Sequence, residues 1–154
     1  MLRLDTTVWH EILAEAWRVY PEEACGLLTA EAGGGPDAPI VGFLPVRNAA
    51  ASSRIFQLDP MGYMKAERAA DDGGLEIVGV MHSHTHTGAY PSPTDVGEAT
   101  KPLVPPSWHW VIVSLAWGEP ELRSFRVDAG VGDVPVLAGQ HAPAGIAEEP
   151  VALA

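Results

Sequence analysis

The side chains best suited to chemistry lie in one short stretch, MHSHTHTGAYPSPTD, at residues 81–95. His82 and His84 follow an apolar run, LEIVGV, that is typical of a buried strand. Residues two apart in a strand project to the same face, separated by two rises of about 3.3 Å each, so both imidazoles can reach one metal ion. Zinc accepts imidazole and carboxylate ligands, and a catalytic site uses three of them plus water. Asp95 is the candidate third ligand, because Gly88 and two prolines turn the chain back.

Two features of this stretch have alternative interpretations. The segment Ser92-Pro93-Thr94-Asp95 is also a good start for a helix, with serine at the N-cap, proline at the first helical position and aspartate at the third. His86 could join the other histidines in a three-histidine site, although the following Thr87-Gly88 predicts that the strand is ending and that His86 faces solvent. A three-histidine site predicts that His86→Ala abolishes metal binding and that Asp95→Ala spares it, whereas a His-His-Asp site predicts the reverse.

A hydrolytic metal site also needs a base for water and a group that stabilises the oxyanion. Glu23, in PEEACGLL, stands at the start of an expected buried strand and is a candidate base, although such a residue is often simply a solvated strand end. Ser92 could aim its hydroxyl at the oxyanion. Cys25 is expected to pack in the core, with a redox or metal-quenching role as the alternative.

The elements expected to position these residues alternate irregularly between helix and strand. Helical spacing of apolar residues, a cap at Asp5–Thr7 and the stop at Pro21 predict a helix over 6–20. A second helix is expected from Pro60 to the pair Gly73-Gly74, and a short one after Ser92. Strands are expected at 24–32, 39–46, 54–59, 75–81, 108–117 and 121–127. The pattern indicates a mixed α+β or three-layer domain around one sheet.

Length and composition limit the class of protein. The 154 residues suit one domain, and the formal charge of −11 argues against a nucleic-acid partner, which needs a basic face. A single cysteine excludes an intrachain disulfide. Charged residues interrupt the apolar character of the N-terminus, and no apolar run is long enough to span a membrane. The expected location is the cytoplasm, with no membrane association.

Taken together, Glu23, His82-Ser83-His84 and Asp95 preceded by Pro91-Ser92 resemble the signature of the JAMM (MPN+) zinc metalloprotease family. The resemblance extends over FQLDP, EIVGVMHSH and ELRSFRV, which together span most of residues 1–128. It implies a single MPN/JAMM-like domain of cytidine-deaminase-like, three-layer α+β architecture over 1–128. From about Asp128 the sequence is rich in glycine, proline and alanine, so residues 129–154 are expected to be a C-terminal extension, a short strand followed by a flexible tail beyond Gly139.

The resemblance also implies roles for individual residues. His82, His84 and Asp95 would bind Zn²⁺, and Glu23 would pass a proton from water to the leaving amine. Ser92 would help to hold the oxyanion, and Ser83 would support the loop through hydrogen bonds. The reaction would be hydrolysis of a peptide or isopeptide bond.

One position departs from the family pattern. Thr85 stands where many members have proline after the second histidine, and it is expected to affect the substrate groove. With threonine at this position, the sequence resembles the actinobacterial branch of the family. That branch releases cysteine from a small ubiquitin-like sulfur-carrier protein with a C-terminal Gly-Gly tail, in cysteine biosynthesis. Two alternatives are a deubiquitinase-like isopeptidase acting on another ubiquitin-like tag and a non-catalytic MPN scaffold module.

Overall fold

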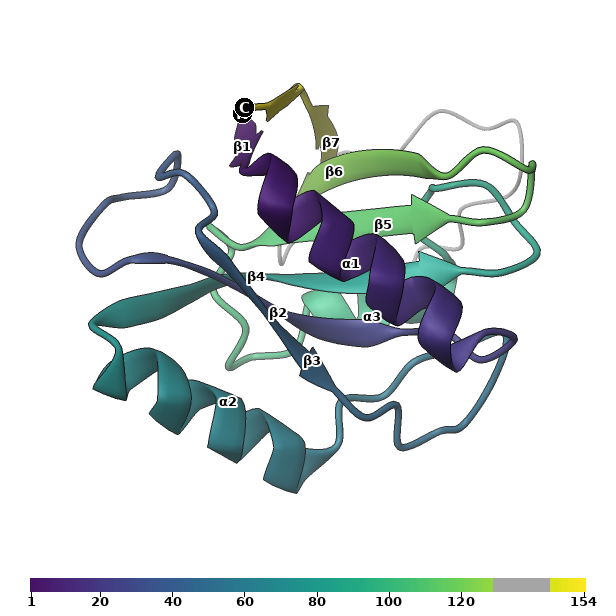
Figure 1. Ribbon diagram of the computed structural model, residues 1–154, viewed down its shortest axis with the longest axis horizontal. Helices are drawn as coiled ribbons and strands as arrows, with labels where there is room; N and C mark the ends of the chain where they lie inside the picture. Colours follow the sequence, from purple (N-terminus) through teal and green to yellow (C-terminus); the bar gives the residue numbers. More distant parts are fainter. Residues whose placement is uncertain (129–144) are drawn as a thin grey trace.

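A six-stranded mixed sheet forms the centre of the computed structural model, which describes residues 1–128 and 145–154 (Figure 1). Its strand order is β3-β2-β4-β5-β6-β7, and only the central pair, β4 and β5, is parallel. The strands are β2 (Cys25–Glu31), β3 (Gly42–Val46), β4 (Leu75–His84), β5 (His109–Ser114), β6 (Glu121–Val127) and β7 (Ile146–Glu149). His82 and His84, the candidate ligands, therefore lie at the end of the central strand β4, where the sheet is covered on both faces.

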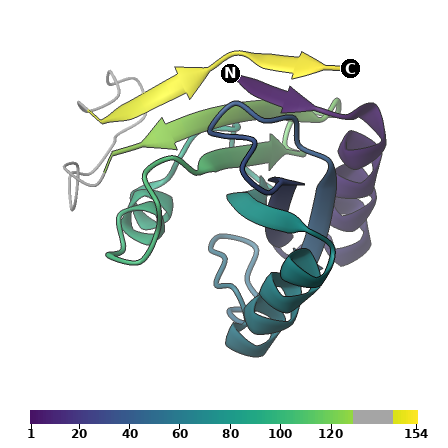
Figure 2. The same cartoon turned by 90° about the vertical axis from the view of Figure 1, so that its left-hand side faces the viewer.

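Helices cover the two faces of this sheet and make three layers (Figure 2). Helix α1 (Thr6–Val19) packs Val8, Ile12 and Ala16 on one face, together with alternate side chains of β4 and β5 such as Met81 and Val111. Helices α2 (Pro60–Asp72) and α3 (Pro93–Ala99) bury Ala66, Val96 and Ala99 on the other face, with Val80, Trp110 and Ile112 from the same strands. The predicted α+β architecture with a central mixed sheet is confirmed.

One predicted strand, residues 54–59, is wrong. Only Leu58 of this segment forms a bridge, with Asn48, and no regular strand follows. The buried side chain of Asn48 takes the hydrogen bonds that a neighbouring strand would make, donating to the carbonyl of Ile55 at 3.0 Å and accepting from the N–H of Gln57 at 3.0 Å. A side-chain amide thus replaces a strand ladder here, and it shapes the segment 48–57 into a loop.

Residues 145–154 are not the flexible tail expected beyond Gly139. Strand β7 pairs with β6, and β8 (Val151–Leu153) pairs in parallel with β1 (Leu2–Leu4), forming a separate two-stranded sheet beside α1 (Figure 2). The rest of the expected extension, 129–144, lies outside the described residues. None of the helices in the described ranges is long and apolar enough for a membrane span.

Candidate metal centre

Three donor atoms meet at the end of β4. The Nε2 atoms of His82 and His84 lie 3.1 Å apart, and each lies 3.1 Å from Oδ2 of Asp95. The histidines reach the same point because side chains two apart in a strand share a face. Asp95 reaches it from the first turn of α3, and all three residues are buried. Two imidazole nitrogens and one carboxylate oxygen thus form a nearly equilateral triangle.

The triangle fits a tetrahedral metal ion. An ion bound at about 2.0–2.1 Å holds its ligand atoms roughly 3.3 Å apart, close to the observed spacing. Nδ1 of His84 lies 2.8 Å from the carbonyl of Gly88, so this nitrogen carries the proton and leaves the Nε2 lone pair for an ion. Without an ion, only protons shared between the two imidazole nitrogens and the carboxylate oxygen would hold these buried atoms so close together. The donor set suits zinc, which accepts both ligand types.

Electrostatics of the cluster also favour a bound cation. Burial alone would raise the pKa of the Asp95 carboxyl, but the two imidazoles hold it well below its usual range. For His84, burial lowers the imidazole pKa, and the neighbouring Asp95 more than compensates and raises it. A carboxylate that stays ionised while buried is the form that a metal ion needs.

The interpretation of Ser92 and Asp95 as a helix cap is correct. Oγ of Ser92 accepts from the backbone N–H of Asp95 at 3.1 Å, and Oδ2 of Asp95 accepts from the N–H of Ser92 at 2.8 Å. This reciprocal capping box begins α3. The cap therefore holds the carboxylate that faces the histidines, and the two predictions describe one arrangement.

Two neighbours fix the ligand-bearing strand. The ring of Phe56 stacks on the imidazole of His82, with centroids 4.3 Å apart and planes 18° apart. The hydroxyl of Ser83 accepts a hydrogen bond of 2.7 Å from the N–H of Ala24, which agrees with the expected supporting role of Ser83. Ala24 directly follows Glu23, so this bond joins the ligand strand to the candidate base.

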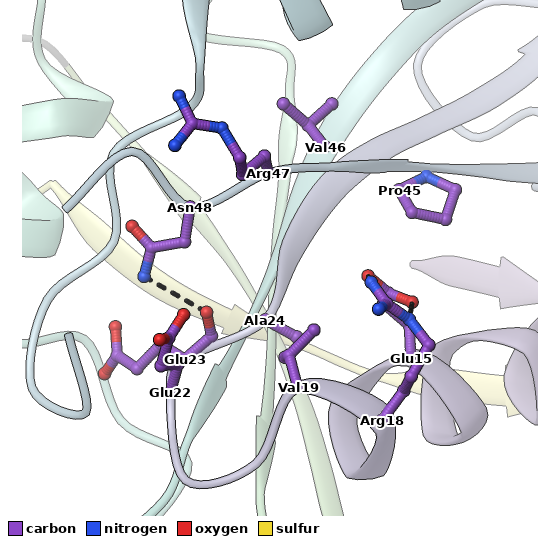
Figure 3. Close-up of a pocket in the computed structure, with 10 residues that line it drawn as sticks. All are labelled: Glu15, Arg18, Val19, Glu22, Glu23, Ala24, Pro45, Val46, Arg47 and Asn48. Carbon is purple, nitrogen blue, oxygen red and sulfur yellow. Dashed lines mark hydrogen bonds and ion pairs between the residues drawn. The ribbon is translucent and has the colours of Figure 1, made fainter. Parts of the chain in front are cut away.

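Glu23 is a buried carboxyl whose Oε2 has no hydrogen-bond partner among residues 1–128 and 145–154. Its backbone is fixed on both sides, because its N–H donates to the carbonyl of Ser52 at 2.8 Å. Its carbonyl accepts from Nδ2 of Asn48 at 3.1 Å, a bond that Figure 3 shows. Burial raises the pKa of the Glu23 carboxyl to about 7, with His84 lowering it and Asp95 raising it further. A side chain with this pKa can both take and give a proton near neutral pH.

Glu23, His84 and Ser92 line one cleft of about 440 Å³. Its other lining residues are Ser53, Arg54, His86 and Thr87. The candidate base, a candidate ligand and the candidate oxyanion donor therefore share a space into which a substrate could enter.

The structure does not support every residue weighed from the sequence. His86 is exposed and stands outside the ligand cluster found among the described residues, so the three-histidine site is wrong. Cys25 is buried, donates to the carbonyl of Val46, and burial raises the pKa of its thiol to about 12, as suits a core residue. The sequence patterns did not identify Asn48 or Arg54 as residues that shape or line the site. An asparagine followed by a run of small residues, in RNAAASS, was the available signal for a loop organised by one side chain.

Comparisons with known proteins agree with this geometry. A model of the family described as prokaryotic homologs of the JAB domain matches residues 5–128. The chain is 41% identical over 129 residues to the CysO-cysteine peptidase of Mycobacterium tuberculosis, covering 81% of this chain and 82% of that protein.

Two solved structures are also similar. A Desulfitobacterium hafniense protein solved in solution has a TM-score of 0.78 and 29% identity, covering all of this chain and 93% of that one. A JAB1/MPN domain protein of Archaeoglobus fulgidus, at 15% identity and a TM-score of 0.54, covers 99% of this chain and 97% of that one and shares the fold. The chain therefore belongs to the prokaryotic JAB-domain family and is a peptidase of the JAMM type.

Proposed function

We propose that the protein is a zinc-dependent peptidase that hydrolyses the bond at the C-terminus of a small ubiquitin-like sulfur-carrier protein and releases cysteine. One observation carries this proposal: three donor atoms spaced 3.1 Å apart adjoin a cleft that also holds an unpaired, buried carboxyl. Ligand geometry and a base in one cleft are the two requirements of a metallopeptidase.

His82, His84 and Asp95 would hold the ion. A bound zinc ion supplies a Lewis acid that makes water more acidic and polarises the scissile carbonyl. The stacked Phe56 and the hydrogen bond from His84 to Gly88 orient the imidazoles for this role.

Glu23 would move the proton. Its carboxylate takes a proton from the attacking water and delivers it to the leaving nitrogen, so the C–N bond breaks and a carboxylate and an amine are formed. Ser92 would stabilise the oxyanion. Its Oγ already accepts from the N–H of Asp95, so the hydroxyl hydrogen remains free to donate to the developing charge.

The substrate assignment is supported by the similarity to the mycobacterial CysO-cysteine peptidase, whose alignment covers four-fifths of this chain. A carrier with a Gly-Gly tail would place an extended, narrow backbone in the cleft, where glycines allow close approach to the ligands. An added strand along the sheet edge would hold such a tail.

The test is hydrolysis of a carrier protein ending in Gly-Gly-Cys, followed by intact mass spectrometry for the loss of one cysteine. We expect cleavage by the zinc-loaded wild type. Glu23→Gln is expected to lower kcat by about 10²–10⁴-fold while it keeps its zinc, because only the proton carrier is lost. Cleavage of a lysine isopeptide but not of this substrate would favour the isopeptidase alternative, and cleavage of neither would overturn the proposal.

A further inference from the structure

One positively charged side chain lines the cleft beside the candidate base. Arg54 shares this lining with Glu23, His84 and Ser92 and is exposed. Its guanidinium has no carboxylate partner in the part of the chain that the structure describes. Five other lysine and arginine side chains do form ion pairs with carboxylates: Arg18, Arg47, Lys101, Arg123 and Arg126. In a chain with a formal charge of −11, an unpaired arginine at this cleft is available to an anionic ligand.

The backbone next to Arg54 is attached to the reaction site at several points. The hydroxyl of Thr85 donates to the carbonyl of Ser53 at 2.9 Å, one residue after the ligand His84. The carbonyl of Ser52 accepts from the N–H of Glu23 at 2.8 Å, and the Ser52 hydroxyl accepts from the N–H of Arg54 at 3.1 Å. The loop that carries Arg54 is therefore fixed relative to both the base and the end of β4.

Thr85 makes one of these attachments with a side chain that proline lacks. A proline at this position has no hydroxyl to donate, so the hydrogen bond to Ser53 depends on threonine. The departure at Thr85 from the family pattern thus has a structural consequence, which is the position of the loop that contains Arg54.

We propose that Arg54 binds the α-carboxylate of the leaving residue and so selects substrates in which one C-terminal residue follows the scissile bond. The inference rests on the proposed function and specifies its leaving group. In a single leaving residue the carboxylate carbon lies two bonds from the scissile nitrogen, close to the reacting atoms. The planar guanidinium matches a carboxylate with two parallel hydrogen bonds. A longer peptide presents a neutral amide at that point, and a lysine isopeptide presents a methylene chain.

The experiment compares two carriers that differ in one group. Both end in Gly-Gly-Cys, one with a free α-carboxylate and one with an α-carboxamide, and kcat/KM is measured for each with zinc-loaded enzyme. We expect the wild type to prefer the free acid by about 10- to 100-fold, the scale of a charged hydrogen-bonded pair. Arg54→Ala should lose this preference. Its kcat/KM for the free-acid carrier should fall, and its kcat/KM for the amide carrier should stay within about two-fold of the wild-type value.

Two further variants control the measurement. Arg54→Lys keeps the charge but loses the two parallel N–H donors of the guanidinium, and it should retain part of the preference. Arg68→Ala removes an exposed cation on α2, outside the cleft, that has no carboxylate partner among the described residues, and it should keep the full preference. Arg54 and Arg68 are both exposed, so neither substitution should change the unfolding midpoint. Measuring the midpoint of each variant checks that folding is unchanged.

Each other outcome has a separate meaning. Equal rates on acid and amide by the wild type would overturn the inference and leave the proposed peptidase function intact. An equal loss on both substrates in Arg54→Ala would also overturn it, because the side chain would then act on something other than the carboxylate. Cleavage of neither carrier by the wild type would overturn the proposed function and the inference with it.

Discussion

The hydroxyl of Ser83 accepts a 2.7 Å hydrogen bond from the backbone N–H of Ala24, and this contact joins the strand of the candidate ligands His82 and His84 to the residue after Glu23. The return bond, from the N–H of Ser83 to the carbonyl of Ala24 at 2.9 Å, closes the pair. The distance between the candidate metal ligands and the candidate base is thereby set by two strands held in register at β2 and β4.

Ser83→Ala tests this connection. The variant leaves a buried N–H without an acceptor, which should cost about 1–3 kcal/mol of unfolding free energy. Because Ser83 is not a ligand, zinc content should stay at the wild-type level while kcat falls. Denaturant unfolding, elemental analysis and carrier hydrolysis measure the three quantities. A loss of zinc together with unchanged kcat per bound zinc would show that the bond supports the ligands alone.

Asn48 is expected to control the loop that fixes Glu23. Its side chain donates to the carbonyls of Glu23 and Ile55 and accepts from the N–H groups of Ala50 and Gln57. Asn48→Ala should lower the free energy of unfolding by about 2–4 kcal/mol, because several backbone groups lose their partner at once.

The matched control for Asn48 is Gln57→Ala, which removes an exposed side chain but keeps the backbone N–H that Asn48 accepts. It should change stability by less than about 0.5 kcal/mol. Similar urea midpoints for the two variants would contradict the account of this loop.

The buried carboxyl of Glu23 should make the free energy of unfolding of the metal-free protein depend on pH. Burial raises the pKa of its carboxyl from 4.5 to about 7, so the folded state binds a proton that the unfolded state releases in this range. The contribution of Glu23 to stability is therefore full below pH 4.5 and is lost as the pH rises through 7.

Glu23→Gln carries no such proton, so we expect its stability gain over the metal-free wild type to grow between pH 5 and 7 and to level off above, at up to about 3 kcal/mol. Thermal unfolding of chelator-treated protein at several pH values measures this difference. Parallel stability curves for the two proteins would show that the carboxyl is not in an unfavourable buried environment.

Neighbouring glutamates in β7 test whether the C-terminal strands belong to the folded domain. Glu149 accepts from Ser124 at 2.7 Å and lies 2.5 Å from Nδ1 of the buried His109. Its side chain is 8% exposed, whereas that of Glu148, paired with Arg123, is 47% exposed. Glu149→Ala should cost about 3–5 kcal/mol, and Glu148→Ala about 0–1 kcal/mol. Equal effects would place these strands outside the cooperative unit.

The candidate metal centre was predictable because its geometry is local. The spacing of His82 and His84 fixes their common face, and the capping sequence around Ser92 fixes the first turn of α3 and so the place of Asp95. The same local patterns predicted the three helices and the central strands. For Glu23, the sequence predicted a place at the start of a buried strand and left a solvated strand end as the alternative, because its burial and its unpaired state depend on distant neighbours.

The remaining features depend on long-range contacts that spacing does not encode. Asn48 turns an apparent strand at 54–59 into a loop through side-chain hydrogen bonds. Glu149 finds its partner 40 residues away in His109, and this contact orders a segment whose glycine, proline and alanine content suggested a tail. In both cases one buried polar side chain outweighs the local propensity.

Zinc content by elemental mass spectrometry tests the central claim most directly. It is measured on the wild type, on Asp95→Asn, which keeps a capping oxygen but loses the anionic ligand, and on His86→Ala. We predict about one zinc per chain in the wild type and in His86→Ala, and a large loss in Asp95→Asn, because a catalytic zinc site uses three protein ligands and this variant keeps only two. Zinc retained in Asp95→Asn and lost in His86→Ala, or no zinc in the wild type after metal is supplied, would contradict the account.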